Sequence, residues 1–168
     1  MIRHAGLIAR LAAGGWRGVL IEGRSGAGKS DLALRALAAG WRLVADDRVL
    51  VWRSQARLFG RAPAPLAGLI EARGVGVVPA PARAFAEIAL IVRCVDAAEV
   101  ERCPDPAAEA VLGVMIPVVA LAPFEESAPA KIDRALAVLD LCGNRRIKRA
   151  APVDGFAGRG RGPVRFPE

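Results

Sequence analysis

The sequence predicts an α/β domain with a mixed sheet core flanked by few helices, and three observations support this. Short apolar runs bounded by turn residues recur along the chain, as is typical of buried strands. Two segments carry apolar residues among good helix formers and are followed by glycine. The 168 residues match one ordinary domain, and 54% hydrophobic against 24% charged residues excludes a disordered chain.

The first half of the chain alternates predicted strands, one helix and loops. Gly40 follows the predicted helix and ends it, and Ser54-Gln55 connects a predicted hairpin. Residues Pro63–Pro81 are rich in proline and glycine, which predicts a loop-rich segment with a short element at Leu69–Glu71. The strands are expected at Gly18–Glu22, Leu43–Ala45, Val49–Arg53 and Arg57–Gly60, and the helix at Asp31–Ala39.

The second half predicts two strands, a helix and a basic tail. The strands are Glu87–Arg93 and Pro117–Ala122, and the helix is Pro129–Cys142, stopped by Gly143-Asn144. Residues 151–168 are rich in glycine, arginine and proline, which predicts a mobile tail after a domain at residues 1–150.

Composition excludes several classes of protein. Seven of the 24 basic residues fall within residues 145–168, so much of the net charge of +7 belongs to the tail. The apolar run Val114–Phe124 is shorter than the roughly 20 residues that span a bilayer, and Arg3 with Arg10 makes the N-terminus too charged for a signal peptide. A cytoplasmic protein without a membrane partner is therefore expected.

Cysteine and histidine are too few for several kinds of metal site. Cys94, Cys103 and Cys142 are widely spaced and form no CxxC pair, so neither a disulfide framework nor a zinc site is indicated. His4 is the only histidine, which excludes a HExxH metal site.

Residues Gly23–Ser30 carry the strongest motif in the chain. They read Gly23, Arg24, Ser25, Gly26, Ala27, Gly28, Lys29 and Ser30, which matches G-x-x-x-x-G-K-[ST] between a predicted strand and a predicted helix. Backbone N–H groups of such a loop point at phosphate oxygens, the lysine reaches the β and γ phosphates, and the serine hydroxyl suits Mg²⁺. The sequence therefore predicts a P-loop-containing domain that binds ATP or another nucleoside phosphate.

Two adjacent carboxylates, Asp46 and Asp47, follow the next predicted strand. Strand ends in a parallel α/β sheet face one crevice, so one carboxylate can hold the metal while the other accepts a proton from an attacking hydroxyl. An ordinary turn before the next strand is the competing interpretation, because aspartate is a common turn residue.

A second polar cluster, Glu71 and Arg73, lies beside Gly74 and Gly76. Glu71 offers oxygen to a metal, and Arg73 offers a planar guanidinium to phosphate. A surface ion pair beside a glycine turn is the alternative. His4 by itself is an exposed or core histidine.

These segments together resemble the catalytic domain of the HPr kinase/phosphorylase family. The resemblance rests on His4-Ala5, on Gly23–Ser30, on Ala39–Val49 with its Leu-Val-Ala-Asp-Asp-Arg-Val sequence, and on Glu71–Val78 with its Glu-x-Arg-Gly-x-Gly sequence. It covers Arg3 to about Val78 well, is loose from there to Cys142, and is absent from the tail.

The resemblance implies an enzyme that uses ATP and Mg²⁺ to phosphorylate a serine of the phosphocarrier protein HPr, and that in many members also removes the phosphate. It implies that Asp47 is the general base on the serine, that Asp46 supports the site or the metal, and that Glu71 is a second metal carboxylate. Arg73 matches the arginine of the Glu-x-Arg-Gly loop, and His4 matches a histidine close to the reacting groups.

Three departures from the family pattern bear on function. His4 stands at the start of the chain, so the sequence looks like the short, catalytic-core form. Trp41 stands where a histidine is common. The Pro-x-x-Gly-Arg-Asn-like segment that long forms use in dephosphorylation, and partly in their hexamer, is replaced by Ile116–Pro123, which leaves dephosphorylation and a homo-oligomeric state open.

Two other functions compete with a protein-serine kinase. A nucleotide-sensing regulatory module with little or no phosphotransfer fits the same P-loop. A nucleic-acid-associated ATPase would use the basic tail, but the body contains no motif that reads RNA or DNA.

Overall fold

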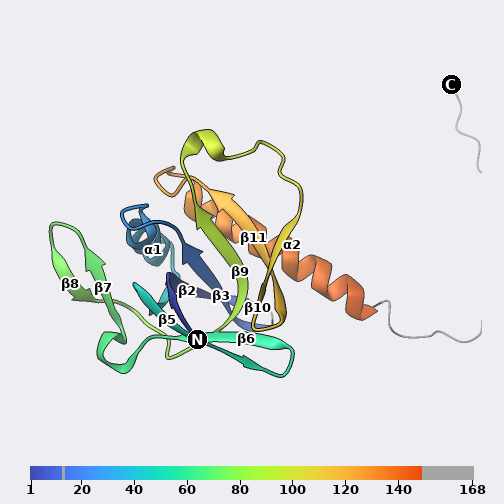
Figure 1. Ribbon diagram of the computed structural model, residues 1–168, viewed down its shortest axis with the longest axis horizontal. Helices are drawn as coiled ribbons and strands as arrows, with labels where there is room; N and C mark the ends of the chain where they lie inside the picture. Colours follow the sequence, from blue (N-terminus) through green and yellow to red (C-terminus); the bar gives the residue numbers. More distant parts are fainter. Residues whose placement is uncertain (13, 149–168) are drawn as a thin grey trace, which may run out of the picture.

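A mixed sheet of nine strands forms the centre of the molecule (Figure 1). The computed structural model of the chain describes residues 1–12 and 14–148. Two α-helices, α1 (Lys29–Ala38) and α2 (Ala128–Lys148), and two 3₁₀ turns, η1 (Ala64–Leu66) and η2 (Ala97–Glu99), accompany the strands. In chain order the strands are β1 (Ile2–His4), β2 (Gly6–Ala12), β3 (Gly15–Glu22), β4 (Arg42–Ala45), β5 (Arg48–Ser54), β6 (Arg57–Arg61), β7 (Leu69–Ala72), β8 (Gly76–Pro79), β9 (Ala86–Cys94), β10 (Ala107–Val111) and β11 (Val114–Leu121).

The strand order places several strand ends at one edge of the sheet. The order is β1-β5-β6-β9-β3-β2-β4, with β11 also on β9, β10 on β11, and β7 and β8 in a separate pair. β3, β9 and β11 run parallel, and their arrowheads point to the top of Figure 1. β2 is antiparallel to both β3 and β4, so β4 runs in the same direction as β3. The loops that follow β3, β4, β9 and β11 therefore leave the sheet at one edge, where α/β proteins bind ligands.

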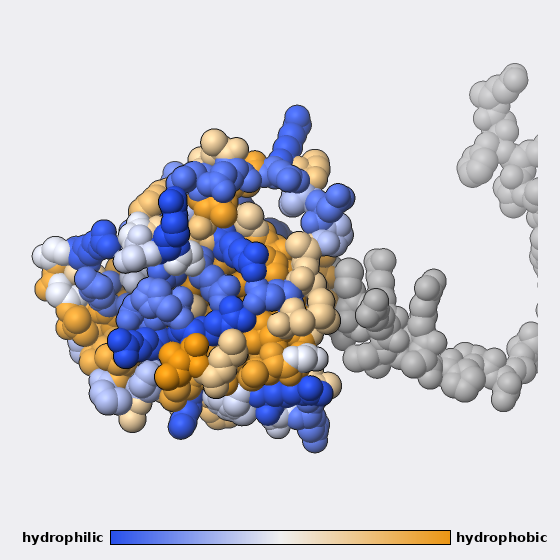
Figure 2. Space-filling view, in the orientation of Figure 1, coloured by the Kyte–Doolittle hydropathy of each residue, from blue (hydrophilic) through white to orange (hydrophobic). Residues whose placement is uncertain are grey.

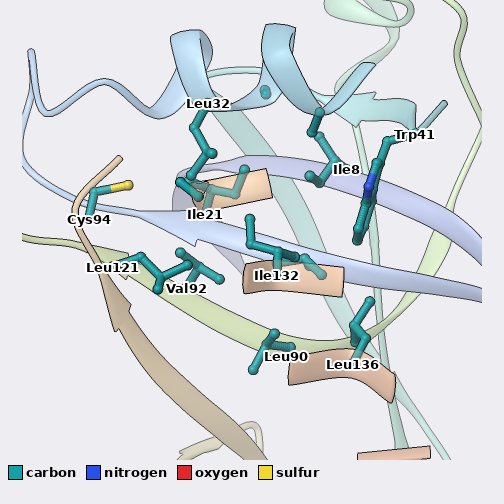
Figure 3. Packing of buried hydrophobic residues seen from close by; sticks show 14 of the residues in the cluster. Ile8, Ile21, Leu32, Trp41, Leu90, Val92, Cys94, Leu121, Ile132 and Leu136 are labelled. Carbon is teal, nitrogen blue, oxygen red and sulfur yellow. The ribbon is translucent and has the colours of Figure 1, made fainter. Parts of the chain in front are cut away.

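The sheet buries apolar side chains on both faces. On one face Ile21 and Leu90 pack with Leu32 of α1 and Ile132 of α2 (Figure 3). On the other face Leu20, next along β3, packs against strands of the same curled sheet. Both helices thus cover one face, while β5, β6 and β10 curl over the other. The predicted α/β class with a mixed sheet and few helices is confirmed.

The helix after the P-loop forms where its sequence predicts. Leu32, Ala33 and Ala36 are buried on one side of α1. Gly40 lies just beyond the helix with φ +91°, a left-handed conformation that glycine adopts at little cost. The nine segments predicted as strands, short element or helices all coincide with elements of the structure, and apart from the end of the second helix their bounds agree to within a few residues.

The second helix is longer than predicted. Gly143-Asn144 was expected to stop it, but the helical backbone continues to Lys148, 21 residues in all. Once several turns exist, each further residue adds a hydrogen bond, which outweighs the roughly 1 kcal/mol penalty of one glycine. The basic tail, residues 151–168, lies outside the described residues.

Four strands are absent from the prediction. The alanine-rich β10 has low intrinsic strand propensity and forms because it pairs with β11. The segment Pro63–Pro81 was expected to be mostly loop. It contains the hairpin β7–β8, in which Ile70 is buried and lies opposite Val78. The N-terminal strands β1 and β2 complete the set.

Hydrophilic residues gather across the middle of the face shown in Figure 2, over the central strands. Within residues 1–12 and 14–148, neither helix is long and apolar enough to cross a bilayer.

Candidate active site

The P-loop connects the carboxyl end of β3 to the start of α1, as its motif predicts. Gly26 has φ +81° and Gly28 has φ +88°, and these left-handed residues turn the backbone around a central space. Gly28 is also the N-cap of α1, and no side chain caps the helix. The first N–H groups of α1 are therefore available to an anion, which the helix dipole also favours.

Lys29 holds its ammonium group against the loop. The residue is only 8% exposed, and Nζ donates hydrogen bonds to the carbonyl oxygens of Gly23 and Arg24, each at 3.0 Å. An ammonium has three N–H donors, so one is left for a ligand. A backbone hydrogen bond also closes the loop, from the Ala27 N–H to the Arg24 carbonyl at 3.1 Å. Ser25, between them, is exposed.

Asp46 joins the P-loop to the β7–β8 hairpin. It is 6% exposed, accepts a hydrogen bond on Oδ1 from the Ser30 hydroxyl at 3.0 Å, and accepts another on Oδ2 from the Glu71 backbone N–H at 3.0 Å. These bonds compensate for the burial of a carboxylate. A hydroxyl and a carboxylate oxygen in contact are the hard donors that Mg²⁺ takes beside phosphate oxygens and water. The pair Ser30–Asp46 therefore fits a magnesium ion.

Asp47 points away from its neighbour toward solvent and His4. Its Oδ1 lies 3.1 Å from His4 Nδ1, its Oδ2 lies 3.8 Å from Arg48 Nε, and the side chains of Asp47 and His4 are both 56% exposed. The backbone fixes this contact, because the Ala5 N–H donates to the Asp47 carbonyl at 3.1 Å. Asp47 has φ +66°, which aspartate tolerates better than most residues. One carboxylate thus serves the loop, and the next is open to an incoming group.

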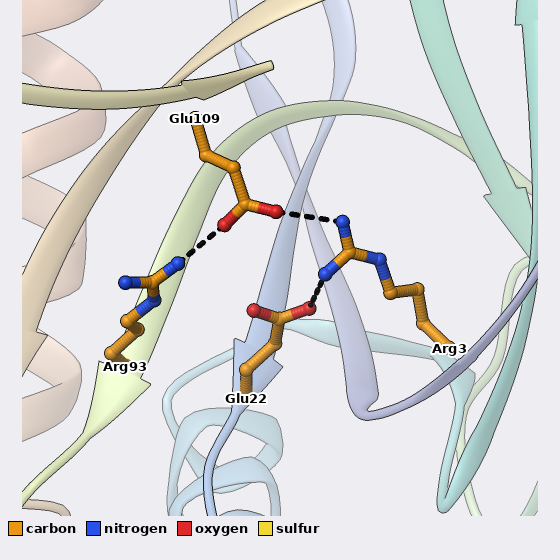
Figure 4. A network of polar contacts seen from close by, with 4 residues as sticks. All are labelled: Arg3, Glu22, Arg93 and Glu109. Carbon is orange, nitrogen blue, oxygen red and sulfur yellow. Dashed lines mark hydrogen bonds and ion pairs between the residues drawn. The ribbon is translucent and has the colours of Figure 1, made fainter. Parts of the chain in front are cut away.

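A network of charged side chains holds β1 in place beside this site (Figure 4). Arg3 donates to Glu22 at 2.9 Å and to Glu109 at 2.7 Å, and Arg93 donates to the other oxygen of Glu109. Glu22 is the last residue before the P-loop, and Arg3 precedes His4. The network therefore connects the histidine strand to the loop strand and to β10.

The network changes the proton affinity of its members. The hydrogen bond to Arg3 lowers the pKa of Glu109, and the hydrogen bond to Glu109 raises the pKa of Arg3. Glu109 is thus ionised and Arg3 protonated throughout the physiological range. Nothing in the residue spacing indicates these contacts, which join positions up to 106 apart in the chain.

Two predicted site residues have a weaker connection to the site. The Glu71 backbone bonds to Asp46, but the Glu71 carboxylate makes no hydrogen bond or ion pair with another described residue. Arg73 is exposed on the turn between β7 and β8 and likewise has no partner among the described side chains. Within residues 1–12 and 14–148, no three histidine, cysteine or acidic side chains gather as a metal cluster.

An open cavity of about 1090 Å³ adjoins the P-loop on the side away from Asp46 and Asp47. Its walls are the loops after β3, β9 and β11, with Cys94 between them. Burial raises the pKa of the Cys94 thiol to about 11, so it stays protonated at neutral pH and acts as a small apolar wall residue. The sequence pattern predicts neither the ring of Phe124 in this wall nor the hydrogen bonds by which Arg35 of α1 holds the neighbouring carbonyl oxygens of Pro123 and Glu125.

Comparison with protein families gives one match. A family described as the HPr serine kinase C-terminal domain matches residues 12–121, more than half of the chain. The match includes the P-loop, Asp46, Asp47, Glu71 and Arg73, and begins after His4.

Curated relatives and a solved structure agree with this match. An HPr kinase/phosphorylase of Clostridium acetobutylicum is 45% identical over 39% of this chain and 21% of its own length. One of Lactiplantibacillus plantarum is 52% identical over 36% of this chain and 20% of its own. The chain thus spans about a fifth of the length of these relatives. The Hpr(Ser) kinase/phosphatase of Coxiella burnetii has the same fold, with a TM-score of 0.66, 24% identity, and coverage of 90% of this chain and 99% of that one.

Proposed function

This chain belongs to the HPr serine kinase C-terminal domain family, and we propose that it transfers the γ-phosphoryl group of ATP to a serine of an HPr-type phosphocarrier protein in the presence of Mg²⁺. Residues 1–150 are the catalytic domain in this proposal. One observation carries it: the Ser30–Asp46 pair and the Asp47–His4 pair occupy adjacent positions beside the P-loop. The expected cytoplasmic location is part of the same proposal, because ATP and the carrier must both be available.

The chain's own groups suit the phosphates and the metal. The N–H groups of Gly23–Gly28 and of the first turn of α1 bind phosphate oxygens, and the Lys29 ammonium contributes its remaining donor. Ser30 and Asp46 would hold Mg²⁺, and Glu71 supplies a second carboxylate from the hairpin. A bound magnesium ion neutralises charge on the phosphate oxygens.

Asp47 is placed to handle the proton of the acceptor. The serine Oγ forms a bond to the γ-phosphorus, the bond from that phosphorus to the bridging β–γ oxygen breaks, and ADP leaves. The serine proton passes to the Asp47 carboxylate, which is exposed and can be reached by the acceptor from solvent. His4 orients that carboxylate, and Arg73 stabilises the transferring phosphoryl group from the open side of the site. In dephosphorylation of the carrier, an oxygen of water or inorganic phosphate would take the phosphoryl group, the bond from phosphorus to the serine oxygen would break, and Asp47 would act as the acid that protonates the leaving serine oxygen.

Phosphosite mapping tests the proposal. The protein is incubated with Mg²⁺, γ-labelled ATP and an HPr-type carrier, and the carrier is analysed by mass spectrometry. We expect one phosphorylated serine and no label when that serine is alanine or when Mg²⁺ is chelated. Tight ATP binding with an unlabelled carrier would instead support a nucleotide-sensing module without phosphotransfer. Binding of the protein to duplex DNA with a steep salt dependence would support the nucleic-acid alternative.

A further inference from the structure

The cavity beside the P-loop has more room than a triphosphate needs. Its three walls are the loops that leave the carboxyl ends of the parallel strands β3, β9 and β11, at the top of Figure 1. β3 lies between β2 and β9 in the sheet, so the cavity extends to one side of the P-loop and the Asp46–Asp47 pair lies on the other. A nucleotide with its terminal phosphate toward Asp47 would direct its base into this cavity.

Phe124 stands where the P-loop meets the cavity. It is 69% exposed and follows β11 on the loop that closes one wall. The far edge of its ring lies against Gly28: a Cβ atom added to Gly28 would come within 2.7 Å of the Phe124 Cζ atom. The rest of the side chain is largely exposed, and Phe124 belongs to the lining of the cavity.

The loop that carries Phe124 is firmly attached to its surroundings. Arg35 of α1 donates hydrogen bonds to the carbonyl oxygens of Pro123 and Glu125, on both sides of the ring. The Glu125 N–H donates to the Ala122 carbonyl at 3.2 Å, which closes a turn around Phe124. The backbone that carries the aromatic ring is therefore held in position before any ligand arrives, which lowers the entropy lost on binding.

The charges of this cavity suit a neutral group better than a phosphate. Both arginines in its wall already have carboxylate partners: Arg24 pairs with Asp96 at 3.5 Å, and Arg93 pairs with Glu109. The buried Cys94 thiol is uncharged at neutral pH. Lys29, the buried cation of the P-loop, does not line this cavity.

We propose that Phe124 is the stacking platform for the nucleobase, and that the loops after β9 and β11 form the base pocket. The inference rests on the proposed nucleotide site and adds the position of the base within it. Aromatic rings stack on the faces of nucleobases with little dependence on base identity. Removal of the ring should therefore weaken the binding of nucleotides and leave the affinity for ligands without a base unchanged.

Calorimetric titration with two ligands tests this proposal. Mg²⁺-ATP and Mg²⁺-inorganic triphosphate are each titrated into the wild type, Phe124→Ala, Phe124→Leu and Phe124→Trp. Loss of stacking should weaken ATP binding by roughly 5- to 150-fold in the alanine variant, with triphosphate affinity unchanged. Leucine keeps an apolar contact with Gly28 but has no aromatic face, so it should behave like alanine, whereas tryptophan should bind ATP as well as the wild type does.

Phe85→Ala is the matched control, because Phe85 is 51% exposed and lies in an aromatic cluster with Trp52 and Phe59, outside the cavity. It should bind both ligands like the wild type. Equal loss of ATP and triphosphate in Phe124→Leu, or no loss of either, would overturn the base-stacking proposal. Failure of the wild type to bind either ligand would instead overturn the proposed nucleotide site.

Discussion

Asp47→Asn is expected to lower the rate of phosphoryl transfer to the carrier by roughly 10²- to 10⁴-fold, the usual contribution of a general base. The amide has the shape of the carboxylate but cannot take the serine proton. ATP affinity should be unchanged, because the contacts of the P-loop run through Lys29, Ser30 and Asp46 rather than Asp47. Single-turnover transfer and calorimetric ATP binding measure the two effects separately.

Asparagine is the informative replacement because of the backbone at this position. Asp47 has φ +66°, which asparagine tolerates and alanine does not tolerate as well. Asp105→Asn removes one exposed carboxylate elsewhere on the described surface and should leave the transfer rate unchanged. A normal rate in Asp47→Asn, or a loss that consists only of weaker ATP binding, would refute the role of Asp47 as the base.

Lys29→Ala is expected to weaken ATP binding by roughly 10- to 100-fold, the effect of losing a hydrogen bond to a charged group. The Lys29 ammonium is the cation held at the P-loop and has one donor available for phosphate. Calorimetry with Mg²⁺-ATP measures the loss, and thermal unfolding shows whether the domain still folds. Arg102→Ala, which removes one exposed positive charge elsewhere, is the control. Equal ATP affinity in Lys29→Ala and wild type would show that the nucleotide binds at another place.

The contact between Ser30 and Asp46 could be anticipated from the sequence. The motif places Ser30 at the start of a helix after one strand, and Asp46 follows the next predicted strand. From the sequence, the two strands are expected to belong to a parallel sheet. In the structure, β2 lies between β3 and β4 and is antiparallel to both. β4 still runs in the direction of β3, so both loops reach the same edge of the sheet.

The contact between His4 and Asp47 could not be derived from spacing. It depends on β1, an N-terminal strand that the sequence pattern does not predict and that pairs with β5 so that His4 lies opposite Arg48. Family resemblance alone indicated that His4 belongs near the reacting groups. The charged network around Arg3 and the ring of Phe124 also depend on long-range pairing, of β10 with β11 and of β11 with β9, which local patterns do not encode.

A crystal structure with Mg²⁺ and a non-hydrolysable ATP analogue tests the geometry of the proposed site most directly. We predict that the terminal phosphate lies between the Lys29 ammonium and the Asp47 carboxylate, with the metal on Ser30 and Asp46. A nucleotide bound elsewhere, or a terminal phosphate turned toward Phe124 and away from Asp47, would contradict the proposed phosphotransfer.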